Sequence, residues 1–185
     1  MRELSLHILD VVENAIEANA AHVDLQITED MDADLLQITV IDDGSGMDAD
    51  AVRRVRDPFF TTRKTRHVGL GIPLFAAAAE RCEGALAVAS TPGEGTTIEA
   101  QFRHSHIDRA PLGDLPGTLV CILMNDRNVD LRFRHTRVVC GAAHTFELDT
   151  IQIRHVLGDV PLTHPAVRDW LRAHIAGGEA QLKEA

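Results

Sequence analysis

Cysteine is scarce in this chain, and its three cysteines do not form pairs. Cys82, Cys121 and Cys140 stand far apart, without a CxxC motif. This distribution is typical of reduced thiols in a cytosolic protein and argues against a disulfide or zinc framework. We therefore expect a cytoplasmic protein.

Long apolar runs and excess positive charge are missing as well. No uninterrupted apolar stretch reaches the roughly 18 residues of a membrane helix, and charged residues follow Met1 too soon for a signal peptide. The 18 Lys and Arg residues against 28 Asp and Glu residues give a net charge of -10. Because a phosphate-contacting surface needs clustered Lys and Arg, we expect no nucleic acid among the partners. Because no apolar run is long enough for a membrane helix, we expect no membrane among them either.

What remains is ordinary for a soluble globular protein, with 45% apolar and 25% charged residues. A length of 185 residues fits one domain, or a domain of about 100 residues with a companion half.

Hydrophobic periodicity in the first part of the chain predicts helices that alternate with pairs of strands. The first helix is expected to begin with Ser5 as its N-cap and to run to about Ala18. The order predicts an α+β fold, a two-layer α/β sandwich with a mixed sheet and helices on one face. The further expected elements are strands 22–28 and 35–41, a short helix 48–55, a long helix opened by Gly69-Leu70-Gly71 and ending near Gly84, and strands 86–90 and 96–102.

After Phe102 the sequence changes character. Residues 104–116 are polar, contain two prolines and are expected to form a linker. The expected elements beyond it are strands 118–124, 129–133 and 143–148, helices 151–157 and 166–175, and a frayed end at 177–185. We therefore divide the chain into a first domain, residues 1–103, and a small α+β extension of unknown role, residues 104–185.

Several short motifs in the first domain carry recognisable chemistry. Asp10 and Asn14 are one helical turn apart, so both side chains lie over the same cavity. A helix that begins at a glycine turn offers N–H groups and a macrodipole that favour phosphate. The glycine-containing motifs are Asp42-x-Gly44-x-Gly46, Gly69-Leu70-Gly71 and Gly93-Glu94-Gly95-Thr96.

Together these motifs resemble the ATPase superfamily shared by sensor histidine kinases, gyrase, the heat-shock chaperone and mismatch-repair ATPases. The resemblance covers roughly residues 4–103 and implies the Bergerat-type ATP-binding fold. One glycine turn alone would be a weak signal, whereas five boxes in family order and spacing are a strong one. The boxes are residues 10–18 (DVVENAIEA, N box), 42–47 (DDGSGM), 57–63 (DPFFTTR, F box), 69–72 (GLGI) and 93–96 (GEGT).

The resemblance implies that the chain binds ATP with Mg2+ and assigns roles to individual residues. Asn14 matches the magnesium ligand, and an amide oxygen suits this hard cation. Asp42 matches the carboxylate that accepts a hydrogen bond from the adenine amino group, which favours ATP over GTP. The further nucleotide contacts implied are Gly44, Gly46 and Met47 at the base, Phe60, Thr61, Thr62 and Arg63 of the F box, Gly69, Leu70 and Gly71 at the phosphates, and Thr96 near adenine.

Asp10 is the candidate catalytic residue, and two interpretations of it stay open. The gyrase-like and anti-sigma-factor branches carry a Glu here that activates water or a hydroxyl, whereas histidine kinases usually carry Asn. Asp can act as a base but reaches less far than Glu. His67 stands where histidine kinases usually have the first glycine of their second glycine box, which predicts a short lid.

The leading functional prediction is a protein kinase that phosphorylates a separate partner, since no phosphoacceptor hairpin precedes the N box in this chain. Two alternatives remain: a nucleotide-gated binding module without phosphotransfer, and a dedicated ATPase with Asp10 as its base. The extension is expected to dock a protein partner or to form a homodimer.

Overall fold

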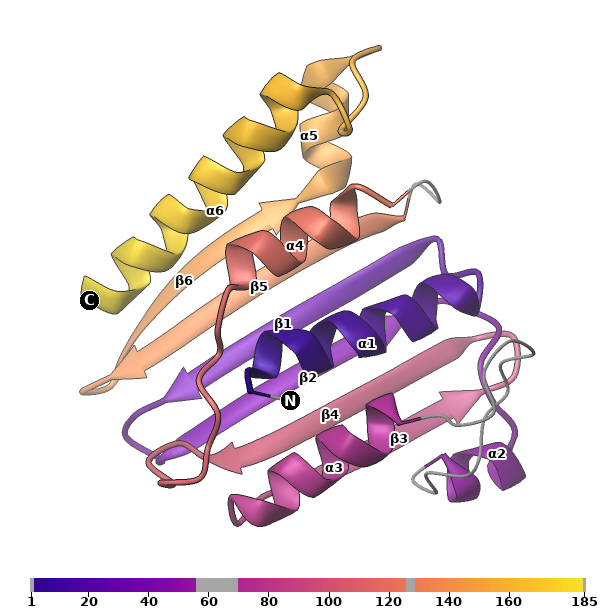
Figure 1. Ribbon diagram of the computed structural model, residues 1–185, viewed down its shortest axis with the longest axis vertical. Coiled ribbons are helices and arrows are strands. Elements are labelled where there is room, and N and C mark those ends of the chain that lie inside the picture. The colour runs from indigo at the N-terminus through magenta and orange to yellow at the C-terminus, as the bar shows by residue number, and fades with distance from the viewer. Residues whose placement is uncertain (1, 56–69, 126–128, 185) are drawn as a thin grey trace.

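The computed structural model describes residues 2–55, 70–125 and 129–184. Figure 1 shows a curved sheet with α1, α3, α4 and α6 over one of its faces. The elements are α1 (Leu4–Glu17), β1 (His22–Asp30), β2 (Leu35–Asp42), α2 (Ala49–Arg54), α3 (Gly71–Arg81), β3 (Ala85–Thr91), β4 (Gly95–Arg103), α4 (Leu115–Leu123), β5 (Asp130–Val139), β6 (Ala142–Asp149), α5 (Thr150–Leu157) and α6 (Pro165–Glu184). The expected α+β sandwich is confirmed.

The six strands form one mixed sheet in the order β3-β4-β2-β1-β5-β6. β1 pairs with β5 in parallel from His22 opposite Asp130 onward, whereas the other neighbours are antiparallel. Residues after 103 therefore extend the sheet that the first hundred residues begin, and both parts contribute to one hydrophobic core. The division into domains 1–103 and 104–185 stays a prediction.

The core lies between the sheet and the helices that cover it. Val23, Leu25 and Ile27 alternate along β1 and are buried, because successive residues of a strand point to opposite faces. On α1, Ile8 and Val12 recur at a spacing of four residues and are fully buried. Asp10 and Asn14 lie outside this buried face, and Asp10 lies beside Gly71 at the start of α3.

Two expectations about helix boundaries are wrong. Residues 118–123 belong to helix α4, with Met124 as its C-cap, and not to a strand, because the Asp114 carboxylate accepts the Gly117 amide at 2.9 Å and Pro116 occupies the first turn. Ser5 is not the N-cap of α1: the helix begins at Leu4 after Glu3, and Ser5 is buried inside it.

The expected linker and the expected frayed end are both ordered. The carbonyls of Pro111 and Leu112 accept the amides of Leu4 and Ser5, both at 2.9 Å, so the segment after β4 packs against the start of α1. At the other end, α6 continues to Glu184. Its last turn is held because the Arg137 guanidinium donates to two of its backbone carbonyls.

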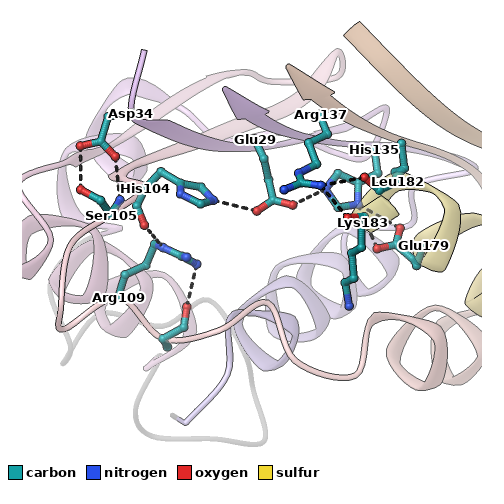
Figure 2. A network of polar contacts seen from close by, with 11 residues as sticks. Glu29, Asp34, His104, Ser105, Arg109, His135, Arg137, Glu179, Leu182 and Lys183 are labelled. Atoms are coloured by element: carbon teal, nitrogen blue, oxygen red, sulfur yellow. Dashed lines mark hydrogen bonds and ion pairs between the residues drawn. The ribbon is translucent and has the colours of Figure 1, made fainter. Parts of the chain in front are cut away.

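A buried polar network joins α6 to the sheet at the end of β1 (Figure 2). His135 of β5 lies between two carboxylates, Glu179 of α6 and Glu29 of β1. Glu29 also contacts Nε2 of His104 at 2.9 Å. The C-terminal helix is thus held by charged groups as well as by apolar packing. None of the helices in the described part of the chain is both long and apolar enough to cross a membrane.

Candidate nucleotide-binding site

On β3, β4 and β2, the last row of side chains on the helix-covered face of the sheet consists of polar residues. Asp42 at the end of β2 is directly opposite Thr96 of β4, and Thr96 is directly opposite Ser90 of β3. Directly opposite residues in antiparallel strands point to the same face. The preceding row, Val40, Ile98 and Val88, is apolar, so on these three strands the core ends at this line. The row forms the floor of the candidate site.

The loop after β2 is held between α1 and the β3–β4 turn. The Gly44 amide donates to Oδ1 of Asp42 at 2.9 Å, which closes a local turn. The Ser45 amide donates to the carbonyl of Ala18 at the end of α1, and the Ser45 carbonyl accepts the Gly93 amide, both at 2.8 Å. The first glycine box and the last box therefore form one structure.

Two glycines are required where these boxes meet. Gly46 has φ +64°, and a Cβ there would lie 2.0 Å from the carbonyl oxygen of Thr91. Gly95 has φ +110°, and its Cβ would lie 1.9 Å from the carbonyl oxygen of Asp42. Only glycine combines these backbone angles with such close approach. Gly95 thus packs directly against the residue expected to contact adenine.

Asp42 and Asp43 are adjacent but have different environments. Burial raises the pKa of Asp42, and hydrogen bonds with the Gly44 and Thr96 backbones oppose that rise without cancelling it. Asp43 instead accepts the amides of Ala21 and His22 at 2.7 and 2.8 Å and contacts Nδ1 of His22 at 2.7 Å. Asp43 anchors the loop, and Asp42 is the carboxylate that a ligand donor would stabilise.

Asp10 of α1 lies beside the start of α3. A Cβ on Gly71 would lie 3.3 Å from Cβ of Asp10, so the first turn of α3 passes close to Asp10. One turn earlier, His7 stacks on Phe75 of α3, with ring centroids 5.1 Å apart and planes inclined by 12°. Burial lowers the pKa of His7 to about 4, so the ring is neutral and acts as packing at neutral pH.

The described site residues gather around one end of the sheet. Asp42, Gly44, Gly46, Met47 and Thr96 surround the end expected to hold the base, and Asp10 and Gly71 lie together where the phosphates are expected, with Asn14 one turn further along α1. Leu70 immediately precedes α3 and is 48% exposed. The F-box residues Phe60, Thr61, Thr62 and Arg63, together with His67 and Gly69, lie outside the described residues, and their roles stay predictions.

The oxygen ligand on α1 fits magnesium that is bound together with a nucleotide. Among the described residues no group of three or more His, Cys, Asp or Glu side chains is placed to hold a metal. Magnesium bound with a nucleotide needs only one or two protein oxygens, because phosphates and water supply the others. Asn14, with a neutral amide oxygen on α1, is suited to that role.

Sequence reasoning missed Ser90. Its Oγ accepts the Met47 amide at 2.8 Å, donates to the carbonyl of Gly95 at 2.8 Å and lies 2.9 Å from Oγ1 of Thr96. One hydroxyl therefore connects three residues of two motifs. Its position six residues before Thr96 on the adjoining strand was the available signal, since a short hairpin places such residues opposite each other.

The fold and the site define a nucleotide-binding α+β domain in which two glycine boxes enclose a partly buried aspartate. A family model described as histidine kinase-, DNA gyrase B- and HSP90-like ATPase matches residues 2–106. The chain belongs to this family and contains an ATP-binding, histidine-kinase-like domain.

Individual relatives agree with this assignment. Sporulation kinase A of Bacillus subtilis (strain 168) is 31% identical over 102 residues, which are 54% of this chain and 16% of that kinase. Sensor protein kinase FleS of Pseudomonas aeruginosa is 42% identical over 89 residues, 48% of this chain and 22% of FleS. The chain thus spans less than a quarter of the length of these relatives.

A solved structure shares the fold. The N-terminal domain of a DNA repair protein superposes with a TM-score of 0.54 at 14% identity, over 80% of this chain and 53% of that one. At this identity the likeness supports the architecture alone.

Proposed function

We propose that this chain is a Mg-ATP-dependent phosphotransferase that phosphorylates a separate protein partner in signal transduction. The observation that carries the proposal is the approach of Gly71, at the start of α3, to Asp10 on α1. It brings a helix N-terminus suited to phosphate to the helix that carries Asn14. The sensor and sporulation kinases among the relatives support a kinase activity.

Each part of the site has a distinct task in this reaction. Asp42 and Thr96 orient the adenine, and the first amides of α3 bind the phosphates. Magnesium held by Asn14 would neutralise phosphate charge. Phosphoryl transfer requires mainly positioning and electrostatic stabilisation, so these contacts supply most of what the reaction needs.

Asp10 supports a second candidate function, a dedicated ATPase. Its carboxyl lies beside the start of α3, where a nucleophile approaching the terminal phosphate would be deprotonated or oriented. In the phosphotransferase the same carboxyl would act on the hydroxyl or imidazole of the partner. A third candidate is a switch, in which ATP binding changes the affinity for a partner, or for a second copy of the chain, without phosphate transfer.

Incubation with γ-labelled Mg-ATP, alone and with a cell extract, separates these functions. Label on a protein band indicates phosphotransfer, and its acid or base lability distinguishes a histidine from a serine acceptor. Release of free phosphate alone indicates an ATPase, and binding with neither product indicates a switch. Asn14→Ala should abolish the magnesium-dependent product, and transfer at the wild-type rate in this variant would contradict the site assignment.

The same assay tests Asp10. Asp10→Asn retains the size of the side chain but removes the base, so hydrolysis should fall by at least tenfold if Asp10 activates water. Asp24→Asn is the matched control, because Asp24 lies on β1 on the opposite face of the sheet from the core residues. Unchanged hydrolysis in Asp10→Asn would remove the support for the ATPase.

A further inference from the structure

The hydrogen bonds of Ser90 determine whether its neighbour at the base end of the site donates or accepts a hydrogen bond. A hydroxyl has one hydrogen to donate and two lone pairs with which to accept. The Gly95 carbonyl can only accept, so the Ser90 hydrogen is used there. The Met47 amide can only donate, and it occupies one lone pair of Ser90 Oγ.

The remaining hydrogen bond, between Ser90 and Thr96, can then have only one direction. Ser90 Oγ lies 2.9 Å from Oγ1 of Thr96 and has a single lone pair left for it. The Thr96 hydroxyl must therefore donate its hydrogen to Ser90. Oγ1 of Thr96 then has only lone pairs to offer to a ligand, so it acts as a hydrogen-bond acceptor.

The register places this acceptor next to another one. Thr96 is directly opposite Asp42, and both side chains point to the helix-covered face. An ionised carboxylate is likewise an acceptor only. The end of the site therefore presents two neighbouring acceptors, which is complementary to a ligand group that carries two N–H donors. A carbonyl at the same place would face oxygen lone pairs without a partner.

We propose that Ser90 is a positioning residue that holds Thr96 as a hydrogen-bond acceptor, so that the site selects a purine with an amino group rather than a carbonyl at position 6. The inference rests on the proposed nucleotide site and deepens it. Asp42 supplies one acceptor of the pair, and Ser90, which has no direct contact with the base, determines the polarity of the other. Specificity thus depends on a residue of β3, one strand beyond the residues that contact the base.

Ser90→Ala tests this polarity with Mg-ATP and Mg-ITP as probes, because inosine carries a carbonyl at position 6. Without Ser90 the Thr96 hydroxyl can rotate and donate to that carbonyl. We expect the ATP affinity to fall about tenfold while the ITP affinity stays the same or rises. The ratio of the ATP affinity to the ITP affinity should therefore fall by at least tenfold. Ser90→Thr keeps the hydroxyl and should restore the wild-type preference. Titration calorimetry measures both affinities.

Thr145→Ala is the matched control. It removes a similar cross-strand hydroxyl contact, 3.1 Å from Thr136 Oγ1, on the far strands β5 and β6, and should leave both affinities unchanged. If Ser90→Ala does not fold, as judged by its circular dichroism spectrum, Thr96→Val removes the same acceptor and should narrow the preference likewise.

Two results would overturn the proposal about Ser90: an unchanged preference for ATP in Ser90→Ala, and an equal loss of affinity for both nucleotides, which indicates a purely structural role. Failure of the wild-type protein to bind either nucleotide would instead contradict the proposed function. The two failures are therefore distinguishable in one titration series.

Discussion

Nδ1 of His135 lies 2.9 Å from Oε1 of Glu179, so a buried ion pair ties the last helix to the sheet. The two side chains are 2% and 8% exposed, and the other ring nitrogen of His135 lies 3.2 Å from Oε1 of Glu29. These residues come from α6, β5 and β1, which are distant in the sequence. The network therefore makes residues after 103 part of the same packed structure as the ATP-binding strands.

Breaking this pair should destabilise the whole chain. His135→Ala leaves the buried carboxylate of Glu179 without its cation and removes one of the two histidines beside the partly buried Glu29, so we expect the free energy of unfolding to fall by about 3–5 kcal/mol. Urea unfolding followed by circular dichroism measures the change. Arg134→Ala is the control, because its pair with Glu147 is solvent-exposed and should contribute less than about 1 kcal/mol. Similar losses in both variants would contradict a special role for His135.

The network should also give stability a defined pH dependence. Burial by itself would lower the pKa of His135, but hydrogen bonds with Glu179 and Glu29 outweigh it and raise the pKa from 6.5 to about 9. A raised histidine pKa stabilises the folded state fully below pH 6.5, and the contribution is lost as the pH rises through 9.

Glu29 has the opposite dependence. Burial alone would raise its pKa, but hydrogen bonds with His135 and His104 outweigh burial and lower it from 4.5 to about 2. Its contribution is present above pH 4.5 and is lost as the pH falls through 2.

The raised pKa of His135 can be tested with the variant His135→Gln. The difference in the free energy of unfolding between wild type and this variant should shrink between pH 6.5 and 9, as measured by urea unfolding at several pH values. A constant difference across that window would show that His135 is not charged.

Asp42→Asn should weaken ATP binding by roughly a hundredfold. The substitution preserves shape but replaces one carboxylate oxygen with an amide that donates, so it disrupts a buried contact with the adenine amino group. Calorimetric titration with Mg-ATP measures the effect. Asp24→Asn serves again as the control on the opposite face of the sheet. Unchanged affinity in Asp42→Asn would show that the adenine lies elsewhere.

Two glycines of the same turn should respond differently to alanine. Gly95→Ala places a Cβ 1.9 Å from the Asp42 carbonyl, so the backbone at the base end must move. We expect a loss of more than about 2 kcal/mol of stability and at least a tenfold loss of ATP affinity. Gly93 has φ +80°, but a Cβ there would meet no atom within 4 Å, so Gly93→Ala should cost only about 1 kcal/mol and leave ATP affinity unchanged. Equal effects would contradict the close packing of the two boxes.

Local patterns made most of the first hundred residues predictable. The alternation of Val23, Leu25 and Ile27 identifies a strand with one buried face, and the structure places it at 22–30. The glycines beside Asp42 predict close backbone approach, and the structure shows it at Gly46 and Gly95, whereas the role of Asp42 as the adenine acceptor stays a prediction from the family resemblance. Such inferences succeed where the cause of a structure lies within a few residues of its effect.

The helix α4 shows where this reasoning fails. Residues 118–124 are apolar almost throughout, and such a run is consistent with a buried strand or a buried helix. In the structure Leu119, Ile122 and Leu123 are all buried, so no periodicity distinguishes the two. Asp114 followed by Pro116 is the local signal for a helix start. The apolar run after these residues fits a strand equally well, and this led to the wrong prediction.

The sequence by itself determined the family, the α+β class and the motifs of the nucleotide site, because glycine turns, helix termini and strand alternation are encoded over short distances. Only the tertiary structure decided that β5 joins β1 in parallel, that His135 lies between Glu29 and Glu179, and that the Ser90 hydroxyl contacts that of Thr96. The physical reason is that these contacts depend on strand order and register. Both are set by the packing of the whole core, and no short segment carries that information.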